Sequence, residues 1–445
     1  MRADVVVVGA GAAGSVMARR LAEIGAEVLL LEAGEERASA QAGVLDVGPT
    51  STVITRYRAN LGDSVVELPR GRTLGGSGAV NGGYCVPARP ADVAEWGPDW
   101  PRRYRAGLAR AAERLRPRLV PMSSTAARLA AAFPGRVSAV PQARDGARRI
   151  TAFEAWDPAG AGARVVAGAR VRQLRWSGGR TGGRCDGVVL DDDEEIRARE
   201  VILCAGSVGT AAILFASGVG PYTGHPVGRG VQEHPELLLD LPADDTDDHA
   251  PLLSHVVRLG QSTGAPEQGA GESEVEVRPY SVPLHRVIPG LAPQPHRIGV
   301  SLMNPRGRGA IVPADGPGGP GGPGGPGGPH AAAGPDTDAD DVWVELSDDS
   351  RDRAVLTDAA TVVARRLGLV DPGIVPALVQ TTSHHLAGSA RIGEVVDESG
   401  RVLDVAGLRV ADASVLPSLP RCGPYYSVLA VAEDLAARVI TERTW

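Results

Sequence analysis

Two adjacent histidines near the C-terminal end of the chain are suited to moving a proton. His384 and His385 stand in the segment SHHLAGSARIG, and an imidazole titrates close to neutral pH. Such a ring can take the proton of a hydroxyl group while a hydride leaves the adjoining carbon atom. Tyr425, in the segment RCGPYYSV, would act at neutral pH as a hydrogen-bond donor rather than as a base. The alternatives are a polar loop for the histidines and aromatic packing for Tyr425.

A second kind of chemistry is indicated at the start of the chain, where a buried strand expected at Val5–Val8 runs into a glycine-rich turn. We interpret Gly9 as the tight turn, Gly11 as the place where backbone approaches a pyrophosphate, and Gly14 as the contact between helix and strand. A second strand then ends at Glu32, whose carboxylate can bind a ribose diol and would repel a 2′-phosphate. Strand, turn, helix, strand and acid in this order predict a dinucleotide site.

Two further glycine-rich turns follow. The stretch RGRTLGGSGAVNGG, from Arg70 to Gly83, lets backbone lie flat against a ligand, although alone it also fits a surface turn. The segments 164–175 and 186–204 are predicted as strands, and the second leads through Ala205 and Gly206 into a helix. We expect this last unit to join the same sheet as the first strand.

Composition excludes several classes of function. A net charge of −7 and a pI near 5.8 argue against a nucleic-acid partner. All 46 basic residues are arginine, which excludes lysine Schiff-base chemistry. The four cysteines are scattered and are interpreted as reduced thiols, and no metal site is expected. The early first strand leaves no room for a secretion signal, and no apolar stretch is long enough for a transmembrane segment. We expect a cytoplasmic protein, either free or peripheral at the inner face of the membrane.

The middle of the chain predicts a second domain. Its apolar or alternating runs indicate strands, and a later amphipathic run indicates a helix. A glycine- and proline-rich block, Gly316–Pro329, is interpreted as a flexible insertion, and the acidic run Asp336–Asp341 beside it as a solvated loop. The expected strands are Leu237–Leu241, Glu274–Arg278, Ile298–Met303 and Val342–Leu346, and the expected helix is Arg351–Leu367.

Taken in order, these motifs resemble those of the glucose-methanol-choline (GMC) oxidoreductases, together with HPVGRGVQEHP at His225–Pro235 and VAGLRVADASVLP near the end of the chain. The resemblance implies an α/β fold: a Rossmann-like FAD-binding domain interrupted by an α+β substrate domain built on an antiparallel sheet. The implied FAD-binding parts are residues 1–94, 159–235 and 381–445. The implied substrate-domain parts are residues 95–158 and 236–380, the latter with the insertion 315–341.

The resemblance also implies roles for individual residues. His385 aligns with the active-site histidine of the family, and His384 would orient or shield it. Tyr425 falls where relatives usually carry His or Asn, and Val80 stands where some relatives attach FAD through His, so FAD is expected to bind non-covalently. The residues implied to hold FAD are Gly9, Gly11, Ala12, Gly14, Glu32, Arg72, Gly75, Gly76, Ser77, Asn81, Val171, Ala205, Gly206, Asp412 and Ala413.

The implied reaction is removal of a hydride from a CH–OH donor to the flavin N5, with His385 as acid/base. The mycofactocin-associated branch is the most similar, which implies that the donor is reduced mycofactocin, a peptide-derived redox cofactor, and that electrons pass to a respiratory acceptor. The alternatives are an oxidase or dehydrogenase of a small free alcohol that uses O2 or a quinone, a lyase with non-redox FAD, and a non-catalytic flavin-binding protein. A direct NAD-dependent dehydrogenase fits less well, because there is one full nucleotide fingerprint.

Overall fold

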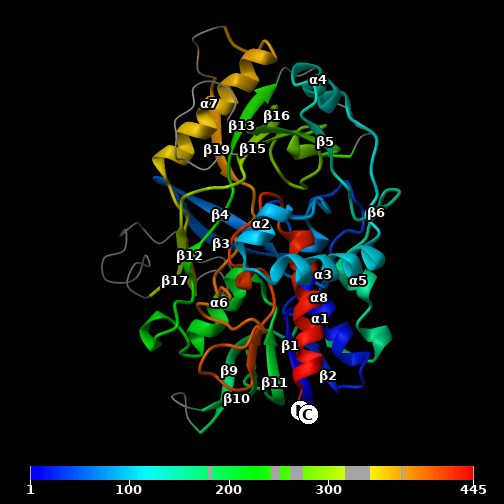
Figure 1. The fold of residues 1–445 in the computed structure, drawn as a ribbon, viewed down its shortest axis with the longest axis vertical. Coiled ribbons are helices and arrows are strands. Elements are labelled where there is room, and N and C mark those ends of the chain that lie inside the picture. Colours follow the sequence, from blue (N-terminus) through cyan, green and yellow to red (C-terminus); the bar gives the residue numbers. More distant parts are fainter. Residues whose placement is uncertain are drawn as a thin grey trace.

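The computed structural model describes residues 2–178, 183–241, 251–260, 274–315, 341–371, 374 and 376–443. Two sheets lie toward opposite ends of the long axis of the molecule, and a third lies between them (Figure 1). The predicted insertion Gly316–Pro329 and residues 336–340 of the acidic run lie outside the described residues. None of the described helices is both long and apolar enough to cross a membrane.

The first sheet has seven strands and is mostly parallel. Val5, Val6 and Val7 of its central strand are fully buried, because helices cover both faces of a parallel sheet. The parallel strands are β1 (Arg2–Val8), β2 (Val28–Leu31), β8 (Arg164–Val166), β11 (Glu195–Leu203) and β20 (Leu408–Val410), and β9 (Val171–Ser177) and β10 (Arg184–Leu190) extend the sheet antiparallel. Strand β20, from the C-terminal region, pairs directly with β11, which in turn pairs with β1.

The last helix joins the two ends of the chain. Helix α8 (Tyr425–Glu442) packs against α1 (Ala12–Ala22) and α3 (Trp100–Leu115). Its buried Glu433 accepts hydrogen bonds from Arg20, Arg110 and the Trp156 indole. A buried carboxylate needs such donors to offset the loss of water. Helices α2 (Pro90–Glu95) and α5 (Ala152–Trp156) pack against α3, whereas α6 (Gly206–Ala216) packs against β9.

The second sheet is antiparallel and has six strands. Alternate apolar residues of its strands pack against helix α7 (Ser350–Arg366), which lies across it at the upper end in Figure 1. In spatial order the strands are β19 (Leu378–Thr382), β13 (Pro235–Leu241), β16 (His296–Leu302), β15 (Glu274–Pro279), β14 (His255–Gly260) and β5 (Val137–Ala139). Helix α4 (Ser124–Ala132) packs against β14 and β15 and contributes Leu129 to the same apolar cluster as α7.

A third sheet of five strands lies between the other two. Its long hairpin alternates buried Tyr57 and Ala59 with the more exposed Arg56 and Arg58, as a half-buried strand requires. In spatial order the strands are β12 (Arg229–Val231), β17 (Gly309–Pro313), β18 (Val342–Glu345), β3 (Ile54–Leu61) and β4 (Ser64–Gly71). The remaining elements are the short pair β6 (Arg144–Asp145) and β7 (Arg148–Arg149), and the 3₁₀ turns Gly76–Ala79, Ala159–Ala161, Pro221–Thr223, Leu284–Arg286 and Ala413–Val415.

The predicted fold class is confirmed, with differences in detail. Segment 164–175 is two strands rather than one, because Gly168 turns the chain between β8 and β9 with φ +70°. The hairpin β3–β4 was not predicted, and β18 belongs to the third sheet rather than to the substrate-domain sheet. Residues 95–158 also differ from the implied substrate domain: α3 packs on α8 and α5 packs on α1, whereas only the part with α4 and β5 joins the antiparallel sheet.

One buried arginine shapes the loop that follows β4. Arg149 is 2% exposed and donates hydrogen bonds to the carbonyl groups of Ser39, Val44, Ala79 and Asn81. Its guanidinium therefore connects two loops that have no strand pairing with each other. Burying so many carbonyl groups without this donor would leave them unsatisfied.

We expect Arg149→Met to lower the free energy of unfolding by about 3 kcal/mol, because buried carbonyl groups would lose their donor. The matched control is Arg148→Met: Arg148 is exposed and pairs with Glu154, so its loss should cost less than about 1 kcal/mol. Urea denaturation of both variants measures the difference. Equal stability of the two variants would contradict the assigned role.

Candidate active site

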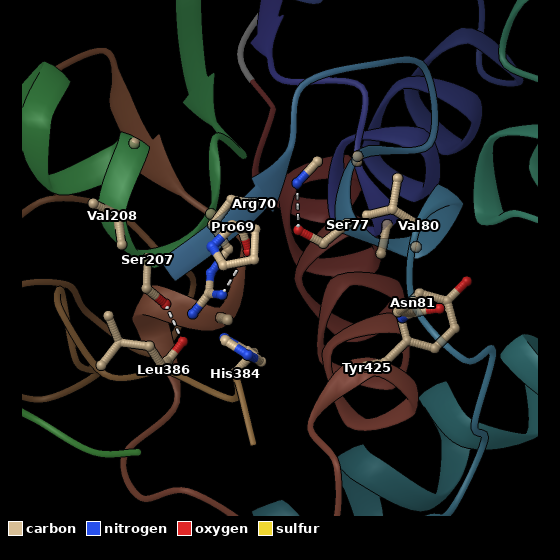
Figure 2. Close-up of a pocket in the computed structure, with 18 of the residues that line it drawn as sticks. Pro69, Arg70, Ser77, Val80, Asn81, Ser207, Val208, His384, Leu386 and Tyr425 are labelled. Atoms are coloured by element: carbon tan, nitrogen blue, oxygen red, sulfur yellow. Dashed lines mark hydrogen bonds between the residues drawn. The ribbon is translucent and has the colours of Figure 1, made fainter. Parts of the chain in front are cut away.

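A cavity of about 1020 Å³ runs between the three sheets. One end is lined by Glu32 and Val171 from the parallel sheet, and the other by Glu236 and Arg278 from the antiparallel sheet. Figure 2 shows residues from separate segments of the chain, among them Ser77, Ser207 and Tyr425, around the same space, with His384 near its centre. A cavity of this size exceeds the usual range for a small ligand, so it has room for a dinucleotide and a second molecule.

The first glycine turn forms the floor of the nucleotide end. A Cβ atom on Gly9 would lie 2.6 Å from the Cys204 carbonyl oxygen, and one on Gly14 would lie 1.8 Å from the Gly9 carbonyl oxygen. These two glycines are therefore required by packing within the protein. A Cβ atom on Gly11 would meet only the Gly76 Cα atom, at 3.8 Å, and the φ of Gly11 is an ordinary −72°. The protein itself gives no reason for glycine at this position, and Gly11 faces the cavity with Ala12 and the N-terminus of α1.

Glu32 is buried beside this turn. Its two carboxylate oxygens accept hydrogen bonds from the backbone N–H groups of Ala10 at 2.9 Å and Gly34 at 3.0 Å. Burial raises the pKa of Glu32 to about 7, although these bonds and the nearby Arg72 favour the charged form. Glu32 thus fixes the shape of the glycine turn, and its predicted bond to a ribose remains a prediction. Arg72 and Val171 line the cavity next to it.

The strand-turn-helix unit at Ala205 and Gly206 also reaches the cavity. Asp412 is 4% exposed and accepts hydrogen bonds from the Gly206 N–H at 2.8 Å, the Thr210 hydroxyl at 2.6 Å and the Ser414 N–H. Its carboxylate is therefore occupied by protein groups, and it connects the end of β20 to the start of α6. Asp412 and the following Ala413 both line the cavity.

The loop after β4 forms another wall. Gly76, Ser77 and Asn81 line the cavity, and Ser77 accepts a hydrogen bond from the Gly71 N–H. Gly75 does not line it: with φ +97°, Gly75 makes the turn and donates its N–H to the Ala10 carbonyl at 2.9 Å. Val80 is buried in a small apolar cluster and also faces the cavity. Its side chain has no atom that could bond covalently to a flavin.

Beside His384 lies a pair of histidines that the sequence did not reveal as a pair. Nδ1 of His385 lies 2.9 Å from Nδ1 of His234, and the two rings are nearly perpendicular. Glu233 accepts hydrogen bonds from the backbone N–H groups of His385 at 2.6 Å and His234 at 2.9 Å. Strand pairing explains this arrangement, because Pro235 of β13 pairs with Thr382 of β19. His234, which precedes β13, therefore lies close to His385, which follows β19.

The surroundings keep these rings neutral. Burial, and then the charge of Arg278, lowers the pKa of His234 to about 3. The same two influences, with His234 itself, lower the pKa of His385 well below its usual range. His384, at φ +59°, is exposed within the cavity, and the loss of bulk water around its ring, with the charges of Arg70 and Arg278, lowers its pKa to about 3. Burial raises the pKa of Glu233 to about 7, opposed by Arg70 at 3.9 Å.

Tyr425 lines the cavity on the side away from His384 (Figure 2). Its ring lies against Gly78, where a Cβ atom would be 2.8 Å away, and burial raises its pKa above the ordinary value. The residue of this loop that lies against His385 is instead Gly423: a Cβ atom there would be 3.3 Å from Nε2 of His385. Counting along the sequence placed Tyr425 in this position, and its contact with a substrate remains a prediction.

The far end of the cavity carries a buried charged network. The Arg278 guanidinium donates hydrogen bonds to Glu236 at 3.0 Å, Glu276 at 2.9 Å and the Ser383 hydroxyl at 2.7 Å. The Tyr280 hydroxyl donates a further bond to Glu236 at 3.1 Å. All of these residues line the cavity. Apolar side chains, among them Leu252 and Leu253, cover the adjoining wall.

Comparison with known proteins decides the family. The two family models for GMC oxidoreductases match residues 3–118 with 133–236, and residues 335–432. The chain belongs to the GMC oxidoreductase family. An uncharacterized GMC-type oxidoreductase in the thcA 5′ region of Rhodococcus erythropolis is 32% identical, over 98% of this chain and 98% of that protein.

Solved structures share the same GMC oxidoreductase fold. Pyridoxine 4-oxidase from Mesorbium loti superposes with a TM-score of 0.75 at 21% identity, over 99% of this chain and 100% of that one. A formate oxidase from Aspergillus oryzae RIB40, whose description names FAD, gives a TM-score of 0.68 at 18% identity, over 99% and 98% of the two chains. At these identities the likeness concerns the fold.

The residues of the cavity fit FAD, the cofactor of this GMC oxidoreductase. The space beside Gly11 is open, although no contact within the protein requires a glycine at this position. Helix α1 begins there without a side-chain cap or an acidic residue in its first turn. Such a helix N-terminus favours a pyrophosphate. The chain is therefore an FAD-dependent oxidoreductase. Sequence reasoning missed Arg70, Glu233 and His234, although all three stand inside the motifs RGRTLGG and HPVGRGVQEHP that identified the family.

We expect Gly11→Val to fold but to be purified with little FAD, because the added methyl groups would enter the cavity rather than the core. The matched control is Gly14→Val, whose Cβ atom would collide with the Gly9 carbonyl. That variant should lose stability by at least about 2 kcal/mol. Thermal unfolding and the ratio of flavin to protein absorbance separate the two effects. A Gly11→Val protein with full flavin content would show that the turn does not contact the cofactor.

Proposed function

We propose that this chain oxidises an alcohol and that His385 removes the hydroxyl proton. The position of the His385 ring supports this most directly. Its Nδ1 is engaged by His234, whereas its Nε2 lies beside Gly423, the residue with no side chain to block it. Bound FAD would supply the acceptor for the hydride that leaves the carbon atom.

The residues of the chain would divide the remaining work. Glu233 holds the backbone of His385, and His384 enters the cavity beside it. Arg278 and Ser383 offer donor and acceptor groups to the polar part of a substrate. The cavity excludes bulk water from the base, which keeps His385 unprotonated. Tyr425 would contribute a hydroxyl from the opposite side.

We propose reduced mycofactocin as the donor, with electrons passing to a respiratory acceptor. The similarity to the mycofactocin-associated branch supports this, and so does a substrate end that combines an apolar wall with the charged network of Glu236 and Arg278. A substrate with a ring and polar substituents would use both surfaces. The alternatives are a small free alcohol and a lyase reaction with non-redox FAD. Anaerobic addition of each donor to purified protein, while flavin absorbance is followed, distinguishes them: a lyase would not bleach.

We expect His385→Asn to bind FAD normally but to be reduced by its donor about 10²- to 10⁴-fold more slowly, the range assigned to one positioned base. The matched control is His384→Asn, because asparagine tolerates the positive φ of that position. The rate of flavin reduction should fall less in this variant, because the histidine pair consists of His234 and His385 and does not include His384. Stopped-flow flavin reduction measures both rates. Reduction of the His385→Asn protein at the parent rate would exclude His385 as the base.

We expect the rate of flavin reduction to stay constant as the pH falls from about 8 through 6.5, and to decrease only at more acidic pH. The active form of His385 is neutral, and its pKa is lowered by burial and by His234, Arg278 and Arg70, so protonation occurs later than in water. An inflection near pH 7 that disappears in Glu233→Gln would belong to Glu233. An inflection near pH 6.5 that persists in Glu233→Gln would contradict the lowered pKa of His385.

A further inference from the structure

We propose that His234 is a positioning residue that sets the tautomer of His385, so that the free lone pair of His385 is on Nε2. This inference rests on the proposed role of His385 as the base. The two rings are 151 residues apart in the chain and come from segments that flank two different strands.

The first step is a count of protons between the rings. Their Nδ1 atoms are 2.9 Å apart, which is a hydrogen-bond distance. In such a bond one Nδ1 carries the hydrogen and the other presents its lone pair. A neutral imidazole carries one N–H hydrogen on its two ring nitrogens. The presence or absence of this hydrogen on Nδ1 therefore decides whether Nε2 of the same ring carries a lone pair or a hydrogen.

The second step is to decide which ring donates. His234 is 0% exposed, and its Nε2 has no hydrogen-bond partner within the described part of the chain. Either ring could donate in this geometry, but the proposed role of His385 as the base requires a lone pair on its Nε2, so its hydrogen must be on Nδ1 and His234 must carry its own hydrogen on Nε2. A hydrogen on Nε2 of His234 leaves a lone pair on its Nδ1. The hydrogen of the shared bond then belongs to Nδ1 of His385.

The third step follows the consequence to the cavity. With its hydrogen on Nδ1, His385 has a lone pair on Nε2, the atom that lies beside Gly423. The opposite tautomer would place an N–H there, and such a ring could not take a proton from a hydroxyl group. His234 thereby prepares the base without touching a substrate.

The backbone holds the two rings in this relation. The Ser383 N–H donates to the His234 carbonyl at 3.0 Å, which continues the pairing of β13 with β19. The Glu233 carboxylate binds the backbone N–H groups of both histidines. Because these bonds involve backbone atoms, a change of the His234 side chain leaves them in place.

The test compares His234→Asn with His234→Leu. The Asn side chain can present an oxygen near the former Nδ1 position, whereas Leu fills similar space without an acceptor. We expect His234→Leu to lower kcat about 10²-fold with a smaller change in KM and normal flavin content. His234→Asn should restore most of kcat. A kcat for His234→Leu equal to that of the parent, or an equal loss in both variants, would overturn the proposal.

A second measurement does not depend on turnover. In protein labelled with ¹⁵N-histidine, the nitrogen shifts of His385, assigned by comparison with His385→Asn, report which ring nitrogen carries the hydrogen. We expect the parent to show hydrogen on Nδ1 at neutral pH, and His234→Leu to lose this preference. Hydrogen on Nε2 in the parent would overturn the proposal. If no alcohol reduces the flavin, the proposed function fails, while the spectrum still decides the tautomer.

Discussion

The hydrogen bonds of the Asp412 carboxylate hold together the segments on which the site depends. This buried group binds Gly206, Thr210 and Ser414, and so attaches the turn after β20 to the start of α6. The segment that follows the histidines then pairs with this turn, because Gly388 and Ala390 donate to the carbonyl groups of residues 413 and 414. The position of His385 is thus set through a chain of backbone bonds that begins at one carboxylate.

The same arrangement explains why the glycine turns and His385 line one cavity. Strands β1, β11 and β20 lie next to one another in the parallel sheet, so the glycine turns that follow β1 and β11 open at the same edge as Asp412. Strands β13 and β19 then carry the chain from this edge into the antiparallel sheet and back. The antiparallel sheet is therefore connected to the glycine turns by paired strands rather than by a single segment.

Sequence patterns predicted those parts of the site whose contacts lie within one short segment of the chain. The first glycine turn was predictable because strand, turn and helix follow each other within fourteen residues, and Gly9 and Gly14 are required by contacts inside that unit. The pairing of His234 with His385 was not, because it depends on the register of β13 against β19, which no short pattern contains. Strand β3 did carry a signal, since polar Arg56 and Arg58 alternate with Tyr57 and Ala59 along it. The packing of α3 on α8 again joins distant segments, so no pattern near residue 95 contains it.

Electrostatics and hydrogen bonding act together at the histidine pair. Arg70 and Arg278 both lower the pKa of His385, even though each has carboxylate partners, Glu233 for Arg70 and Glu236 and Glu276 for Arg278. Because an imidazolium would have to form near two guanidinium groups and away from water, both rings remain neutral. Two neutral rings joined through Nδ1 have one shared hydrogen, and His234, which is fully buried, exchanges no hydrogen bond with solvent. The two guanidinium charges therefore keep both rings neutral. The property that the surrounding protein can still control is the tautomer, that is, which ring nitrogen carries the hydrogen.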